Sequence, residues 1–90
     1  MFLKYEYINR NNKPVQKMLN FDNANYIEVG EYDGANRIII GQSKSVNYFN
    51  YDSLASACYA YNQILNACEN NAHTIILPID GLVDVMSFTI

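Results

Sequence analysis

A chain of 90 residues, half of them hydrophobic and with a formal net charge of −3, has room for a single compact domain over residues 1–90 and for no second core. Eight Tyr and four Phe against two Pro and four Gly describe a globular protein, so the composition excludes an intrinsically disordered one. The acidic balance makes nucleic acid an unlikely partner, and no apolar run approaches the roughly 20 residues that span a membrane.

The start of the chain and the two cysteines indicate the compartment. Lys4 and Glu6 interrupt the first ten residues, where a secretory signal needs an unbroken apolar core. Cys58 and Cys68 lie about 15 Å apart along the predicted helix, whereas a disulfide needs Cα atoms within about 7 Å. Two unpaired thiols predict a reducing compartment and therefore a cytoplasmic protein.

Strands are predicted throughout the first half of the chain. The first run alternates, with Leu3, Tyr5 and Tyr7 on one face. The second run fits either a strand or a short helix, and the strand is preferred. Asp33-Gly34 is a strong hairpin signal between the third and fourth runs, and "GQSK" is a turn before the fifth. The five predicted strands are residues 2–8, 14–21, 26–32, 35–42 and 45–51.

A long helix is predicted over residues 53–70. Asp52 or Ser53 offers an N-cap oxygen, and Asn70 or Asn71 can adopt the left-handed conformation that ends a helix. A helical wheel predicts that both cysteines are buried, as small apolar side chains of the core stripe. This predicted stripe consists of Leu54, Ala57, Cys58, Tyr61, Ile64, Leu65 and Cys68.

Two further runs, residues 73–79 and 82–90, flank Asp80-Gly81, which is a second hairpin signal. Alternation in the last run places Met86, Phe88 and Ile90 on one face. The order of strands, one long helix and a C-terminal β-hairpin predicts an α+β domain, in which the helix packs across one face of an antiparallel β-sheet.

The first sixteen residues of the predicted helix carry no charge, which is unusual for a helix that faces water. A neutral face can be desolvated by another protein at low cost, and a tyrosine adds contact area to it. The alternatives are a ligand groove, or a solvated face without a role. We expect a partner interface on this outer face, with a homo-oligomer as one use of it. The predicted interface residues are Ser56, Tyr59, Gln63 and Asn66.

Aromatic and basic residues in the first half of the chain support an alternative function, a small-ligand binding protein or sponge. Tyrosine rings can stack on a base while Lys or Arg binds a phosphate, so the ligand would be of the nucleotide type. Tyrosine is also a favoured strand residue, and the same pattern therefore fits a plain, half-exposed sheet. The residues of this alternative site are Tyr5, Tyr7, Arg37, Lys44 and Tyr48.

Catalytic and metal-binding patterns are missing from the sequence. The segment "IIIGQSKS" has the composition of a phosphate loop, but it leads into a strand and so lacks the amides and dipole of a helix N-terminus. His73 is the sole histidine, and Cys68 lies on the predicted apolar stripe, where a thiolate is disfavoured. One histidine and two cysteines in such positions cannot converge on a metal. We therefore expect no enzyme activity, no cofactor and no metal.

What remains is a small non-enzymatic protein-binding module. The frequency of Asn, Ile and Tyr indicates AT-rich genes, and small free-standing proteins of this kind are common among phage and mobile-element genes. Some of them inhibit a host defence complex by covering one of its surfaces. Size and composition thus suggest an anti-defence inhibitor that acts by surface occlusion, an argument from protein type rather than from a site.

Overall fold

The computed structural model describes all of residues 1–90 and confirms the predicted fold class, mostly antiparallel β-structure with one helix packed across it. The strands form a three-stranded sheet of order β2-β1-β6 and a four-stranded sheet of order β3-β4-β5-β7. The elements are β1 Phe2–Ile8, β2 Pro14–Asn20, the 3-10 helix η1 Phe21–Asn23, β3 Ala24–Tyr32, β4 Ala35–Gln42, β5 Ser45–Tyr51, α1 Leu54–Glu69, β6 Thr74–Ile76 and β7 Leu82–Thr89.

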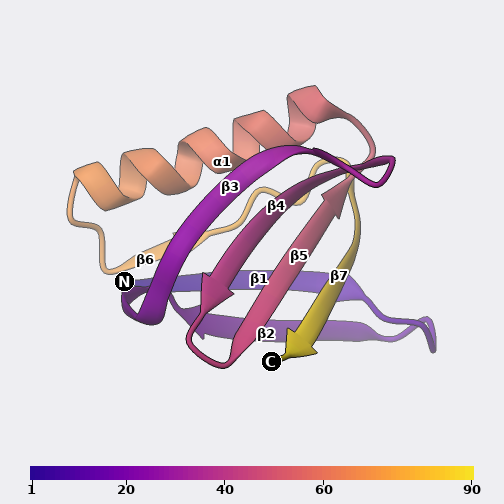
Figure 1. Ribbon diagram of the computed structural model, residues 1–90, viewed down its shortest axis with the longest axis horizontal. Helices are drawn as coiled ribbons and strands as arrows, with labels where there is room; N and C mark the ends of the chain where they lie inside the picture. Colours follow the sequence, from indigo (N-terminus) through magenta and orange to yellow (C-terminus); the bar gives the residue numbers. More distant parts are fainter.

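The two sheets and the helix form two layers. In Figure 1 the four-stranded sheet forms one layer, and α1 together with the three-stranded sheet of β2, β1 and β6 forms the other. The core lies between them, and the rings of Tyr5 and Phe49 meet edge-on across it with their centroids 4.9 Å apart. The buried apolar residues are Leu3, Tyr5, Leu19, Ile38, Ile40, Phe49, Tyr51, Ala57, Ala60, Ile64 and Leu77.

Local signals act as the sequence predicts. Asp33 and Gly34 have φ angles of 54° and 80°, which suit the tight turn of the β3–β4 hairpin. The Oγ atom of Ser53 accepts a hydrogen bond from the Ser56 amide at 3.1 Å and caps the helix. Asn71, with a φ of 54°, ends it. The strand preferred for the second run is confirmed as β2, which pairs with β1 along its whole length.

The two C-terminal strands form, but they are not hydrogen-bonded to each other, which differs from the predicted hairpin. β6 pairs in parallel with β1, and β7 pairs antiparallel with β5 in the other sheet. The connecting segment crosses between the layers because the core holds it: Leu77 is buried, and the Tyr51 hydroxyl donates to the Pro78 carbonyl at 2.8 Å. Asp80-Gly81 therefore turns the chain from one sheet into the other.

The helix is rotated relative to the predicted stripe, and two predicted core positions are wrong. Ala57, Ala60 and Ile64 are fully buried, whereas Leu54 is 45% exposed and Cys68 is also exposed. At 100° per residue this is a rotation of about 60° to 70°. The small side chains of Ala57 and Ala60 let the helix approach the sheets closely. A wheel weighted by hydrophobicity does not account for this fit.

Candidate functional site

The four predicted interface residues of the helix differ in exposure. Tyr59 is 59% exposed and Asn66 is also exposed, so these two share the outer face. Ser56 is only partly accessible, because its hydroxyl accepts a hydrogen bond from Ser53 at 3.0 Å and lies beside the turn at Gly81. Gln63 is half-buried as well. The rotation of the helix thus leaves Tyr59 and Asn66 as the centre of this surface and moves Ser56 and Gln63 to its margin.

The five residues of the ligand alternative lie in different parts of the fold. Tyr5 is 6% exposed in the core, where burial raises the pKa of its hydroxyl, and the Tyr7 ring stacks beside it at 6.2 Å. Arg37 and Tyr48 lie on the far side of the four-stranded sheet, and Lys44 is in the exposed β4–β5 turn. The structure therefore brings Arg37 and Tyr48 together and leaves Tyr5 without a surface on which a base could stack.

Arg37 and Tyr48 belong to the outer face of the four-stranded sheet, which is unusually apolar. Because Ile38 and Phe49 are fully buried, the alternate residues of their strands point away from the core. The strand register places these outward side chains in rows that run across the sheet. We call this surface the aromatic face. It consists of Tyr26, Ile39, Val46, Tyr48, Met86 and Phe88, with Arg37 among them.

No other part of the chain covers the aromatic face. The helix and the three-stranded sheet both pack against the opposite side of the four-stranded sheet (Figure 1). Tyr26 and Phe88 remain 47% and 43% exposed. An antiparallel sheet with one side in water normally alternates apolar inward and polar outward residues. Here two adjacent outward rows are apolar apart from Glu28, and only the row of Arg37, Asn50 and Asp84 is polar. Contiguous apolar patches on the surfaces of soluble proteins are often contact sites.

Tyr26 lies flat across the neighbouring strand because of a glycine. A Cβ atom at Gly41 would stand 2.1 Å from a carbon of the Tyr26 ring, so the ring occupies the space that any other residue would fill. At the other end of the face, the rings of Tyr48 and Phe88 meet at 5.1 Å and 60°. Both contacts fix aromatic rings against the sheet.

A chain of polar contacts holds Arg37 in place. Its Nε donates to Asn50 Oδ1 at 2.8 Å, and Asn50 Nδ2 donates in turn to Asp84 Oδ1 at 2.6 Å. The guanidinium carbon lies 4.4 Å from the centroid of the Tyr48 ring, a cation–π contact. These contacts use one guanidinium nitrogen, and the two terminal nitrogens make no hydrogen bond within the chain. Arg37 is thus oriented on the face with its terminal donors free.

Glu28 supplies a carboxylate at the β3 edge of the same face. Its side chain is exposed and accepts a hydrogen bond from the Tyr32 hydroxyl at 3.0 Å. This hydrogen bond to a carboxylate raises the pKa of Tyr32. The face therefore presents the free terminal nitrogens of Arg37 on β4 and, on the neighbouring strand β3, an exposed carboxylate with one oxygen bound to Tyr32.

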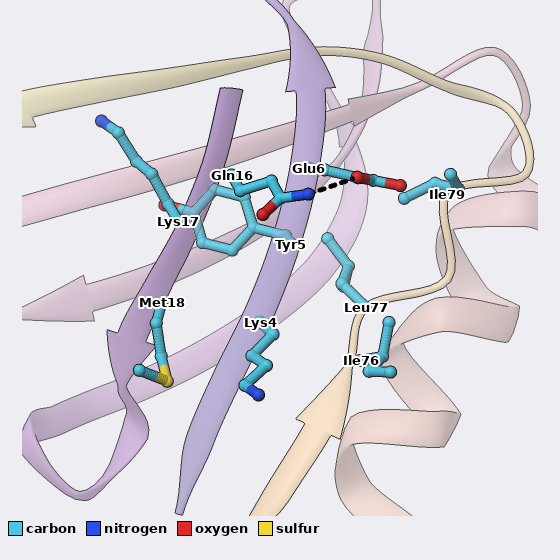
Figure 2. Close-up of a pocket in the computed structure, with 9 residues that line it drawn as sticks. All are labelled: Lys4, Tyr5, Glu6, Gln16, Lys17, Met18, Ile76, Leu77 and Ile79. Carbon is cyan, nitrogen blue, oxygen red and sulfur yellow. Dashed lines mark hydrogen bonds between the residues drawn. The ribbon is translucent and has the colours of Figure 1, made fainter. Parts of the chain in front are cut away.

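A hollow of about 480 Å³ lies on the outer face of the three-stranded sheet. Figure 2 shows Lys4 between Met18 and Ile76 in this hollow, and Gln16 donating to the Glu6 carboxylate at 3.4 Å. Met18 and Ile76 are 57% and 75% exposed. The most exposed part of the lining is thus this apolar pair, with the charged side chain of Lys4 between its two members.

The structure groups no three His, Cys, Asp or Glu side chains in a way that could hold a metal ion. Both cysteines are free, and partial burial raises the pKa of the Cys68 thiol. No local sequence pattern points to a site at Tyr26, Ile39, Met86 or Phe88. Alternation in the last strand did place Met86 and Phe88 on one face, but joining that face to Tyr48 required the β5–β7 register.

The single α-helix is 16 residues long, and no helix of the structure has the length and apolar character needed to cross a membrane. In comparisons with known proteins, no family model, no curated protein and no solved structure matches this chain.

Proposed function

We propose that the protein is a non-enzymatic protein-binding module whose contact surface is the aromatic face. The observation that carries the proposal is Arg37, which is held in place within an uncovered aromatic surface while its terminal nitrogens stay free. Protein interfaces are enriched in Tyr, Phe, Met and Arg, and their strongest contacts centre on Tyr, Trp and Arg. The aromatic face has this composition.

The order already present in the face supports the proposal. Binding normally costs about 0.5 to 1.5 kcal/mol for each flexible side chain that becomes fixed. Arg37 is restrained by Asn50 and Tyr48, the Tyr26 ring rests on Gly41, and Phe88 packs on Tyr48. A partner therefore meets side chains that lose little freedom on contact.

A surface of this kind acts by occlusion, because it covers whatever part of the partner it contacts. Inhibition of a host defence complex, suggested by size and composition, fits the same mode of action. We place the protein in a reducing cytoplasm, where Cys58 and Cys68 stay free thiols. Tyr59 and Asn66 on the helix form a second exposed surface, for which the sequence predicts a partner interface with self-association as one use.

An affinity capture experiment tests the proposal. Tagged wild type, Arg37→Ala and Tyr59→Glu would each be mixed with untagged copies of the chain and with lysate of the cells that carry the gene, and captured proteins would be quantified by mass spectrometry. We expect Arg37→Ala to lower the capture of the specific partner at least about tenfold, as for a central interface arginine. Tyr59→Glu should retain the partner.

Circular dichroism would show that each variant is folded. Phe88→Ser serves as a second variant of the aromatic face, because its side chain is 43% exposed and contributes little to the core. Capture that both Arg37→Ala and Phe88→Ser leave unchanged would reject the aromatic face as the contact surface.

A further inference from the structure

We propose that the aromatic face binds a second copy of this chain, with the two four-stranded sheets packed face to face about a twofold axis. This inference rests on the proposed function, since it names the partner of the same surface. Oligomers of identical chains mostly use twofold contacts, in which each copy presents the same patch. Such a patch has to be complementary to itself in charge and in shape.

The charges of the face meet this condition. Glu28 pairs with Ile39 across β3 and β4, two residues from Arg37, so Arg37 and Glu28 are diagonal neighbours. Consider a twofold axis that lies in the plane between the two sheets and bisects the line from Arg37 to Glu28. Such an axis places Arg37 of each copy opposite Glu28 of the other. The free guanidinium nitrogens then meet an exposed carboxylate twice in one interface.

The same axis also matches the apolar side chains. Neighbouring strands are about 4.8 Å apart, and successive residues of one strand are about 3.3 Å apart. With these spacings the twofold axis runs diagonally across the sheet, close to Ile39, Tyr48 and Phe88. Each of these three side chains then faces the same residue of the second copy. Met86 falls opposite Val46 of the second copy. The two sheets cross at about 70°, close to the orthogonal class of sheet packing.

The remaining charge on this side of the sheet also finds a partner. Asp84 falls opposite the Tyr26 ring of the second copy, which lies across Gly41 and carries a hydroxyl donor. No two like charges are placed opposite one another. The footprint is on the order of 400 Å² on each copy, or about 800 Å² in total, which is below the about 1,200 Å² at which stable specific interfaces begin and therefore predicts a weak, concentration-dependent dimer.

Charge reversal tests the pairing. Light scattering after gel filtration, over a series of protein concentrations, should show the mass of the wild type rising from 10.3 kDa toward twice that value. Arg37→Glu or Glu28→Arg alone places like charges opposite each other and should weaken the dimer at least about tenfold. The double variant carries the exchanged pair in every copy and should restore it.

Tyr59→Glu on the helix and Lys4→Glu on the three-stranded sheet are the matched controls and should leave the dimer intact. Phe88→Ser, which lies on the axis, should disrupt it without touching the charges. A dimer that Tyr59→Glu dissociates and Arg37→Glu does not would overturn the inference. So would a double variant that is folded and still monomeric.

The outcome also separates this inference from the proposed function. A wild type that is monomeric at every concentration, together with capture of another protein that depends on Arg37, would overturn the second copy as partner and leave the aromatic face as a contact surface. A wild type that is monomeric and shows no capture that depends on Arg37 would overturn both.

Discussion

The outer faces of the two sheets are both uncovered and both carry large apolar side chains, yet they are built differently. On the three-stranded sheet, Met18 and Ile76 are more exposed than any side chain of the aromatic face, and Lys4 stands between them. On the four-stranded sheet, aromatic rings rest on one another and on Gly41. Exposed apolar area alone therefore does not identify a contact surface in this protein.

The difference originates in the central strands. The outward positions of β1 are Phe2, Lys4, Glu6 and Ile8, and the two central ones are charged, so charges interrupt the middle of the three-stranded face. The outward positions of β4 and β5 include Ile39 and Tyr48, which are paired in the register and continue the apolar row to β7. Fixing a long flexible side chain costs up to about 2 kcal/mol, so the already ordered face is the better contact surface.

The largest loss of stability is expected for a change in the core between the two sheets. Phe49 lies between the sheets and contacts Tyr5, so Phe49→Ala should lower the free energy of unfolding by about 3 to 5 kcal/mol. Phe88→Ala on the outer side of the same sheet should cost about 1 kcal/mol or less, because its ring is 43% exposed. Urea unfolding measures both. Similar costs for the two would mean that Phe88 is part of the folding core rather than of a contact surface.

A smaller effect should distinguish the polar contacts of the two faces. Asn50 is 8% exposed and links Arg37 to Asp84, so Asn50→Ala should cost about 1 to 3 kcal/mol of stability. Gln16→Ala removes an exposed, 3.4 Å contact to Glu6 and should change stability by less than about 0.5 kcal/mol. Chemical denaturation of the two variants checks this. Equal losses would show that the four-stranded face is no more ordered than the other.

The smallest effect concerns two tyrosines on opposite sides of the four-stranded sheet. Burial raises the pKa of Tyr51, so its contribution to stability is complete below about pH 10, the ordinary value, and is lost as the pH rises further. Tyr51→Phe also breaks the bond to the Pro78 carbonyl and should cost about 1 to 2 kcal/mol at neutral pH, with a weaker alkaline decline. Tyr32→Phe should change neither the stability at neutral pH nor its decline at alkaline pH.

Unfolding midpoints in urea at pH 8 and at about pH 10.5 would measure the alkaline decline. In Tyr32 the hydrogen bond to Glu28 raises the pKa, but the side chain is only partly buried and its ionised form can be solvated. A decline in Tyr51→Phe as steep as in the wild type would show that other groups cause the alkaline loss of stability.

Local features were predictable from the sequence because neighbouring residues determine them. Ser53 caps the helix and Asn71 ends it, and Asp33-Gly34 turns a hairpin, through hydrogen bonds and φ preferences that extend over only a few residues. Alternation likewise predicted that Leu3 and Tyr5 face the same side of β1. Tyr59 and Asn66 are exposed as the helical wheel suggests.

The tertiary structure alone decided which of these elements meet. β6 pairs with β1 from the other end of the chain, and β7 pairs with β5 across the helix, because burial of Leu77 holds the connecting segment between the layers. The rotation of α1 depends on how closely Ala57 and Ala60 fit the sheets. The aromatic face likewise exists only after four strands align, since no local pattern states which rows of side chains become neighbours.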